Sequence, residues 1–285
     1  MNPYAKFIAD LAKLVRQART LPLGGLALLP RPSGEPGAPK ALMFSPHPDD
    51  EVIVGALPLR LLRELHWNVS SVAVTLGSSK TRQAERFEEL RACCDYIGFE
   101  VIKTGENGLE GVSSQARDAN PAAWSRSVAR VAEILADLKP RAVFFPHDND
   151  WNSTHIGTHH LVTDALRMLG GGFSCVTVET EFWGAMDQPN LMVESSEQDV
   201  ADLVSALSFH AGEVRRNPYH VLLPGWLMDN VRRGAERVAG QGESAPDFLF
   251  GTLYRLRRWT GTTFEAAWRG GKILGRAESP GGLFD

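Results

Sequence analysis

Cysteine is scarce in this sequence, and the three that occur among 285 residues are Cys93, Cys94 and Cys175. They show no Cys-x-x-Cys spacing, and three residues cannot build the disulfide framework of a small secreted domain. The adjacent pair lies within a helical pattern, which favours two buried thiols. This cysteine usage is typical of a reducing compartment, and we expect a cytoplasmic protein.

A long uninterrupted apolar run is also absent. No stretch reaches the roughly 18 apolar residues that a membrane-spanning helix requires. The N-terminal segment does not resemble a signal peptide, because four charged residues interrupt its apolar centre: Lys6, Asp10, Lys13 and Arg16. Apolar residues recur there at helical spacing, which predicts a helix packed on the domain. A helix that binds a membrane surface or a partner is the alternative.

The chain carries little net charge. Its 30 basic and 34 acidic residues leave a net charge of -4. This balance argues against a protein that coats nucleic acid or binds membranes through a basic tail. Hydrophobic residues make up 43% of the chain, enough for the core of one large α/β domain, alone or with an appendage. A homo-oligomer remains compatible with this composition.

Strand and helix patterns alternate along most of the sequence. The predicted strands are 41–45, 69–77, 101–105, 141–146 and 173–183. The predicted helices are 51–65, 80–97, 121–138, 155–170 and 198–211. This alternation predicts an α/β fold, a Rossmann-like and mostly parallel sheet with helices on both faces. We divide the chain into an N-terminal helix and connection (1–40), a core (41–215) and a C-terminal extension (216–285) that supplies a lid, late strands or an oligomer contact.

Two of the predicted strands run directly into polar clusters. The first cluster, in SPHPDDE, is His47, Asp49, Asp50 and Glu51. The second, in PHDNDWNSTHIGTHH, is His147, Asp148, Asp150, Asn152, His155, His159 and His160. Ligands of open α/β sheets bind beyond the carboxyl ends of the strands, so both clusters belong in a predicted site. Histidine nitrogens and a carboxylate oxygen are typical zinc ligands.

The residues within these clusters differ in how strongly they indicate a site. Glu51 fits the acidic first turn of a helix, where it is favourable with the helix dipole. His155 and His159 are four residues apart, so a helix places both on one face. A capping or packing role for His159 is as compatible with this spacing as a ligand role, and His160 fits a structural role.

The motifs resemble those of the LmbE-like, or PIG-L, family of zinc-dependent N-deacetylases. SPHPDDE resembles the family's (A/S)HPDDE signature, and PHDNDWNSTH resembles its PHxxDxHxxH segment. TLGSSKTRQAERFEEL resembles a third family stretch, in which a T-x-G turn precedes R-x-x-E-L. A weaker likeness covers LSALSFHAGEV, whose His210 corresponds to a family histidine. The resemblance spans about residues 41–215.

The resemblance implies both an activity and a set of site residues. Family members remove acetyl groups from glucosamine-containing conjugates, which implies an N-acyl amino-sugar substrate. The implied ligands of one zinc ion are His47, Asp50 and His155. Asp49 is implied as the general base for a zinc-activated water, and Arg86 as a contact to the sugar. Asp150 and Trp151 are further candidates for substrate binding, with Trp183 and Arg86 completing a sugar-stacking wall.

Two positions depart from the family pattern. Asn152 replaces a histidine that assists the reaction in the family, and an asparagine can donate a hydrogen bond but cannot shuttle a proton. Thr154 replaces the Asp that precedes the second histidine. The acid that protonates the leaving amine is therefore open, with Asp49, His159 and His210 as candidates.

Two other functions compete with deacetylation. Paired Asp and His residues also build two-metal phosphoesterase sites, in which the ions lie about 3.5–4 Å apart. A family scaffold altered at Asn152 and Thr154 is, alternatively, a protein that binds a glycoconjugate without cleaving it.

Overall fold

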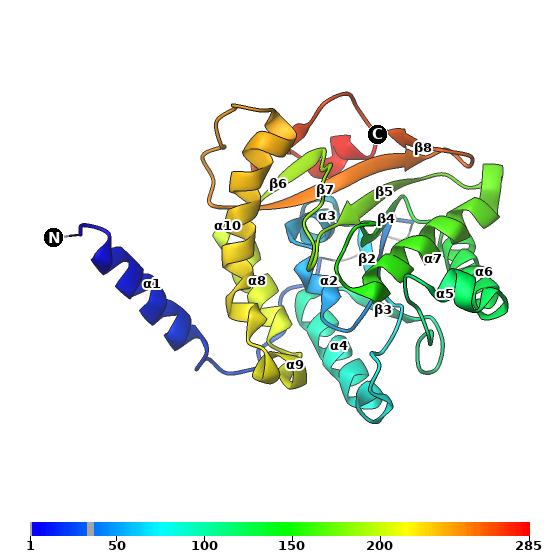
Figure 1. Ribbon diagram of the computed structural model, residues 1–285, viewed down its shortest axis with the longest axis horizontal. Coiled ribbons are helices and arrows are strands. Elements are labelled where there is room, and N and C mark those ends of the chain that lie inside the picture. The colour runs from blue at the N-terminus through cyan, green and yellow to red at the C-terminus, as the bar shows by residue number, and fades with distance from the viewer. Residues whose placement is uncertain (1, 33–36) are drawn as a thin grey trace.

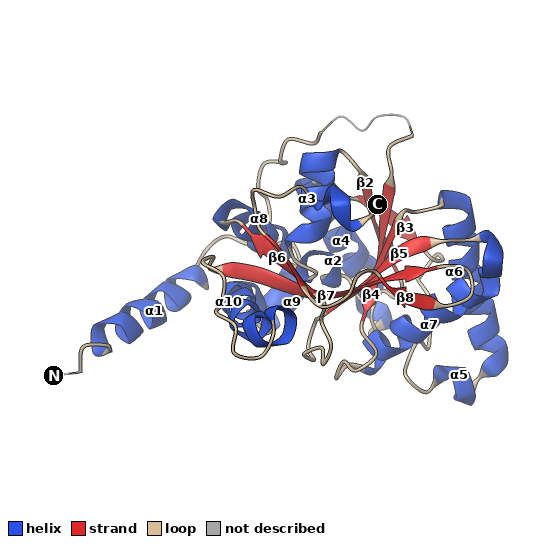
Figure 2. Ribbon diagram, turned by 90° about the horizontal axis from the view of Figure 1, so that it is seen from above, coloured by secondary structure: helices blue, strands red, loops and turns tan. Residues whose placement is uncertain are grey.

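The computed structural model describes residues 2–32 and 37–285, and within them nine strands form one sheet (Figures 1 and 2). The strands follow the order β3-β2-β1-β4-β5-β7-β6-β9, with β8 paired to β7. Their bounds are β1 Lys40–Ser45, β2 Asn68–Ala73, β3 Glu100–Lys103, β4 Ala142–Pro146, β5 Cys175–Thr180, β6 Leu191–Ser195, β7 Phe250–Trp259, β8 Phe264–Ala266 and β9 Lys272–Leu274.

Helices cover both faces of this sheet (Figure 2). Their bounds are α1 Ala5–Ala18, α2 Asp50–Ile53, α3 Ala56–Leu65, α4 Gln83–Ile97, α5 Ala116–Ala119, α6 Pro121–Leu138, α7 Ser153–Leu169, α8 Glu197–Leu207, α9 Ala211–Arg216 and α10 Leu223–Gly234. Short helical turns lie at η1 Lys80–Arg82, η2 Gly170–Gly172, η3 Tyr219–Val221, η4 Ala235–Ala239 and η5 Pro280–Leu283.

The half of the sheet that contains the polar clusters is parallel. Strand β1 pairs in parallel with β2 and with β4, and β3 and β5 extend this arrangement on either side. Side chains alternate across β1, so Ala41 and Met43 enter one buried cluster while Leu42 and Phe44 enter the other. Helices α3, α4 and α8 contribute to the first cluster, and α6 and α7 to the second. The predicted Rossmann-like architecture is confirmed.

The C-terminal region completes the other half of the sheet. Strand β7, predicted only as late strand or lid material, is antiparallel to both β5 and β6 and lies between them. A structural division at residue 215 is therefore absent within the described residues, because the sheet of the core includes strands from both sides of that boundary.

The predicted helix over 51–65 is two helices, α2 and α3. They are separated at Gly55, whose φ of 82° favours glycine. A Cβ atom at this position would lie 2.1 Å from Thr252 Oγ1 on β7. The chain therefore turns at Gly55 against a strand nearly 200 residues further along, which the local hydrophobic pattern does not reveal.

Helix α1 forms where the sequence predicts it, but the structure does not show it packed on the core. None of its residues is buried, and Phe7 and Leu14 are each 63% exposed. The helix stands away from the body of the protein (Figure 1). Contacts begin only in the following connection, where the Gly24 amide donates to Ser208 Oγ at 3.1 Å and the Leu29 amide donates to the Tyr96 carbonyl at 3.0 Å. In the described ranges, no helix has the length and apolarity needed to cross a membrane.

We expect that deleting residues 1–20 changes the free energy of unfolding by no more than about 0.5 kcal/mol, as for surface substitutions, because α1 buries no residue. Urea denaturation measures this change. Leu203→Ala on α8 is the destabilising control, since a buried leucine truncated to alanine costs about 2–5 kcal/mol. A loss comparable to that of the control would mean that α1 packs on the body in solution.

Candidate metal centre and adjoining cavities

Three residues converge beyond the carboxyl ends of β1 and β4. His47 lies in the turn after β1, Asp50 begins α2, and His155 lies in the first turn of α7. Asp50 Oδ2 is 3.3 Å from His47 Nδ1 and 3.3 Å from His155 Nε2, and the two histidine nitrogens are 3.2 Å apart. These are the three residues that the sequence resemblance implies as ligands.

The three separations fit a metal ion. Zinc ligands at about 2.0–2.1 Å in tetrahedral directions lie roughly 3.3–3.4 Å from one another. Asp50 and His155 are buried, whereas the His47 side chain is 19% exposed. The donor set of two imidazole nitrogens and one carboxylate oxygen is that of a catalytic zinc site, which leaves a fourth position for water or substrate.

The electrostatics of this centre also favour a cation. Burial opposes the charged form of His155, but the carboxylates of Asp50 and Asp150 outweigh it and raise the pKa of His155 to about 10. Burial likewise opposes ionisation of Asp50, yet the two neighbouring histidines hold its pKa well below the usual value. The carboxylates therefore favour a positive charge at the centre. A proton on His155 supplies this charge in one case, and a bound metal cation supplies it in the other.

Asp150 lies behind His155. Its Oδ2 is 3.7 Å from His155 Nδ1 and accepts backbone N–H bonds from Trp183 and Gly184, each at 3.2 Å, while Oδ1 accepts the Asn152 amide at 2.8 Å. The carboxylate is buried, which separates it from the surface where a substrate would bind. Asp150 thus faces the second ring nitrogen of His155 from beyond hydrogen-bond distance, on the side from which a metal ligand is commonly oriented.

Asp49 adopts an unusual backbone conformation beside the three ligands. Its φ of 115° lies in the left-handed region, where few residues other than glycine are found. The Asp49 amide donates to Glu51 Oε2 at 2.9 Å, and the Tyr219 hydroxyl donates to Asp49 Oδ2. Burial and then the Asp50 carboxylate raise the pKa of Asp49 to about 6. A carboxylate that titrates near neutrality is suited to general acid–base chemistry.

His210 supports this turn from the interior. It is fully buried, and its Nε2 donates to Glu51 Oε1 at 2.6 Å. Glu51 thus starts α2, as expected, and also links His210 to the Asp49 amide. The structure does not bring His210 into contact with the three ligands or with either cavity described below.

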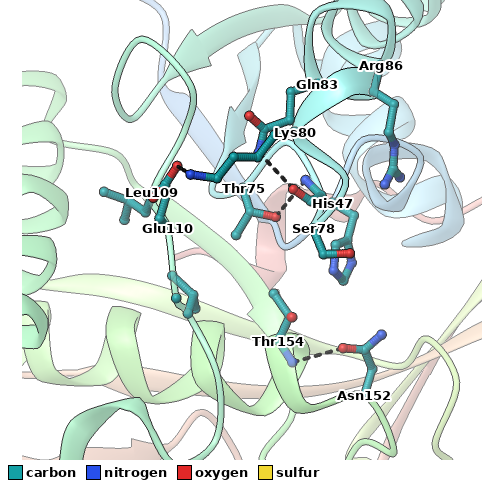
Figure 3. A pocket seen from close by; sticks show the side chains of 13 residues that line it. His47, Thr75, Ser78, Lys80, Gln83, Arg86, Leu109, Glu110, Asn152 and Thr154 are labelled. Atoms are coloured by element: carbon teal, nitrogen blue, oxygen red, sulfur yellow. Dashed lines mark hydrogen bonds and ion pairs between the residues drawn. The ribbon is translucent and has the colours of Figure 1, made fainter. Parts of the chain in front are cut away.

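A polar cavity of about 490 Å³ opens at His47 (Figure 3). Its walls include Thr75, Lys80, Gln83, Arg86 and Asn152. Arg86 Nη2 donates to the Pro48 carbonyl at 2.8 Å and lies 3.8 Å from Asp49 Oδ2. The expected sugar-contact residue therefore lines a polar cavity beside the candidate metal centre.

Asn152 occupies the N-terminal cap of α7. Its Oδ1 accepts the Thr154 amide at 2.9 Å, as Figure 3 shows, which leaves its Nδ2 as a donor at the cavity wall. The cap explains why an asparagine is compatible with this position, where the sequence resemblance leads one to expect a histidine.

A second cavity, of about 290 Å³, is lined by apolar and aromatic residues that include Ile53, Phe182, Tyr219 and Trp226. Trp151 and Trp183 also line it, and Trp151 is 82% exposed. Arg86 lines the polar cavity instead, so the structure does not assemble the expected wall of Trp151, Trp183 and Arg86. Tyr219 and Trp226 come from a region in which the sequence showed no functional pattern.

His159 is also placed apart from the ligands. Its Nδ1 donates to the Pro146 carbonyl at 3.0 Å and is 3.6 Å from Glu179 Oε2, and the residue is buried. Glu179 is itself paired with Arg255 and Arg257. These contacts correspond to the packing role that the sequence left open for His159.

A second group of metal-binding residue types consists of Glu51, Cys93 and His210. All three are fully buried, and Glu51 Oε1 and His210 Nε2 are already joined by a hydrogen bond. Burial raises the pKa of the Cys93 thiol well above its usual value, which disfavours the thiolate that a metal needs. This group therefore belongs to the core, and the described residues present one candidate metal centre beside a cavity.

Comparison with known proteins agrees with the fold and with the sequence motifs. Residues 42–166 match the family described as PIG-L, GlcNAc-PI de-N-acetylase, which is the LmbE-like family that the sequence motifs resemble. The matched region contains all three candidate ligands. No curated protein matches the chain significantly.

Solved structures of related fold include two deacetylases. N,N'-diacetylchitobiose deacetylase from Pyrococcus horikoshii has a TM-score of 0.55 and 16% identity, covering 90% of this chain and 94% of that chain. The zinc-inhibited form of a teicoplanin deacetylase has a TM-score of 0.52 and 16% identity, covering 77% of this chain and 98% of that chain.

Another similar structure is a hydratase. The 4-carboxy-2-hydroxymuconate hydratase from Pseudomonas putida KT2440 has a TM-score of 0.54 and 18% identity, covering 76% of this chain and 95% of that chain. At these identities the likeness shows the fold alone.

We expect the purified chain to bind one zinc ion, measured by equilibrium dialysis and elemental analysis. His155→Ala should abolish this binding, because it removes one of three converging ligands. Asp150→Asn should weaken it by about 10–100-fold, the usual effect of losing a residue that orients a ligand. His159→Gln is the control and should bind zinc normally; zinc loss in this variant would contradict the assignment of ligands.

Proposed function

We propose that this protein is a zinc-dependent amide hydrolase that removes the acyl group from an N-acylated amino sugar or its conjugate. The observation that carries the proposal is the convergence of His47, Asp50 and His155 at zinc-ligand separations, at the mouth of a polar cavity. The match of residues 42–166 to the PIG-L family supports the same reaction, as does Asp49 beside the candidate ligands.

Zinc bound there would polarise the amide carbonyl and lower the pKa of a water molecule. Asp49 is then the group that accepts the water's proton, because its pKa near 6 keeps it mainly ionised at neutral pH. The same carboxyl can return that proton to the departing amine. His159 and His210, the other candidates for this acid, contact groups outside the cavities.

The polar cavity provides donors for the rest of the substrate. Arg86, Lys80 and Gln83 line it, and their side chains suit the hydroxyl groups of a sugar. Asn152 Nδ2 is available to donate to the oxygen on which negative charge develops during attack on the amide. Asn152 thereby supplies stabilisation without proton transfer, and Asp49 supplies the proton transfer.

The fold alone does not select this reaction, since a hydratase shares it. A two-metal phosphoesterase needs ligands for a second ion. The other group of metal-binding residue types, Glu51, Cys93 and His210, is buried and internally bonded, which favours the one-metal reaction, amide hydrolysis. A glycoconjugate-binding protein without activity is the remaining alternative. Zinc binding without amine release from any N-acylglucosaminide would support that alternative.

We expect zinc-loaded protein to release amine from N-acylglucosaminides, and a chelator to abolish this release. Asp49→Asn should lower kcat by at least about 100-fold while zinc stays bound, because proton transfer contributes about 10²–10⁴-fold. Asparagine tolerates the left-handed backbone at this position, so the turn is retained. Asp148→Asn, at a half-exposed acid paired with Arg255, is the matched control. Zinc loss on Asp49→Asn would show that Asp49 is a ligand rather than the base.

Asn152→Asp tests the proposed donor. The new carboxylate can still accept the Thr154 amide and cap α7, but it cannot donate a hydrogen bond. We expect kcat to fall by about 10²–10³-fold, as on loss of an oxyanion donor, with the melting temperature unchanged. Steady-state kinetics at matched zinc content measure this effect. Unchanged kcat would remove Asn152 from the mechanism.

A further inference from the structure

The apolar cavity adjoins the candidate metal centre through three of its walls. The Phe182 ring meets the His155 ring edge-on with centroids 4.9 Å apart, and the Tyr219 hydroxyl donates to Asp49 Oδ2. The backbone amide of Trp183 donates to Asp150 Oδ2. Each of these three walls therefore contacts a different residue at the centre, and these wall residues stand between the apolar cavity and the reacting groups.

The two cavities differ sharply in chemistry. They share no lining residue, and the apolar cavity presents aromatic and aliphatic side chains where the polar cavity presents Arg86, Lys80 and Gln83. A sugar in the apolar cavity would lose its water without gaining hydrogen bonds, which is unfavourable. Trp151, Trp183 and Leu222 line this cavity at 82%, 41% and 50% exposure, an apolar surface typical of a binding site.

We propose that the apolar cavity binds the acyl chain of the substrate, so that the protein hydrolyses long-chain N-acyl amino sugars in preference to N-acetyl ones. This inference rests on the proposed amide hydrolysis. Water adds its oxygen to the acyl carbon, the C–N bond breaks, and the products are a fatty carboxylate and the free amino sugar.

The connectivity of the substrate selects the acyl chain as the occupant. The amide carbonyl carbon has two substituents, the nitrogen that carries the sugar and the acyl chain. With the sugar in the polar cavity, an aglycone continues from the sugar, whereas the acyl chain leaves the carbonyl carbon in the other direction. The cavity of about 290 Å³ is far larger than the single methyl group of an acetyl substrate.

Most of the walls of the apolar cavity, Trp226 and Tyr219 among them, come from outside the family-matched region. Both lie outside residues 42–166, the part that matches the family, and so do Phe182 and Trp183. The matched part contains the metal ligands, and most of the apolar walls come from the remainder of the chain. The reaction and the acyl preference thus depend on different segments.

The test is a series of methyl N-acylglucosaminides with acetyl, butanoyl, hexanoyl and octanoyl groups, assayed by amine release with zinc-loaded full-length protein. Each methylene group that is transferred from water into the apolar cavity should raise kcat/KM about fourfold. Allowing for incomplete burial, we expect kcat/KM to rise by at least about 100-fold from acetyl to octanoyl.

Leu222→Asp places a charge on the apolar cavity. Leu222 is half exposed and precedes the first residue of α10, where aspartate is a favoured cap, so the fold should be retained. The ratio of octanoyl to acetyl kcat/KM should fall by at least about tenfold. Met228→Asp, on the same helix, 46% exposed and outside this cavity, is the matched control and should leave the ratio unchanged.

Three results would overturn the inference. Equal kcat/KM along the series, with acetyl hydrolysed, would exclude an acyl site while the proposed hydrolase remained. If kcat/KM rose when an octyl aglycone replaced the methyl aglycone, but did not change with the length of the acyl chain, the cavity would be assigned to the aglycone. Zinc-bound protein that hydrolyses no member of the series would overturn the proposed function itself.

Discussion

The parallel pairing of β1 with β4 is the constraint on which the candidate site depends. These strands are neighbours at the centre of the sheet, although about 100 residues separate them in sequence. Because they run in the same direction, the turn after β1 and the start of α7 meet at one edge. His47, Asp50 and His155 thereby reach mutual separations of 3.2–3.3 Å. Loss of this pairing would leave each segment with an incomplete ligand set.

The crowded acids after β1 are accommodated because each has a different partner. Asp50 faces two histidines, which hold its pKa low, whereas burial and Asp50 raise the pKa of Asp49. Glu51 turns into the interior and binds His210 and the Asp49 amide. The left-handed backbone at Asp49 separates these directions within three consecutive residues. One short motif thus provides a candidate ligand, a candidate acid–base group and a structural brace.

The sequence predicted the parts of the site that depend on local patterns. The strand–helix alternation predicted the fold, and the polar residues after two strands predicted a site at one edge of the sheet, because parallel strands bring their carboxyl ends together. The resemblance to a family implied the three candidate ligands within that site. The break at Gly55 and the burial of His210 depend on contacts with Thr252 and Glu51. Tyr219 lay in a segment without a periodic signal. Such long-range contacts leave little trace in local hydrophobic periodicity, and the exposed α1 had the same amphipathic pattern as a packed helix.

The division of the chain into a family-matched region and the rest has a consequence for function. Residues 42–166 contain the candidate ligands, Asp49 and all the residues that line the polar cavity, and these groups suit the proposed chemistry on a sugar-linked amide. Phe182, Trp183, Tyr219 and Trp226 come from later segments and form the apolar cavity against that centre. Changes in the later segments can alter this cavity while the three ligands stay in place. Under the proposed function, the family-matched region sets which bond is broken, and the aromatic residues beyond it set which acyl group that bond carries.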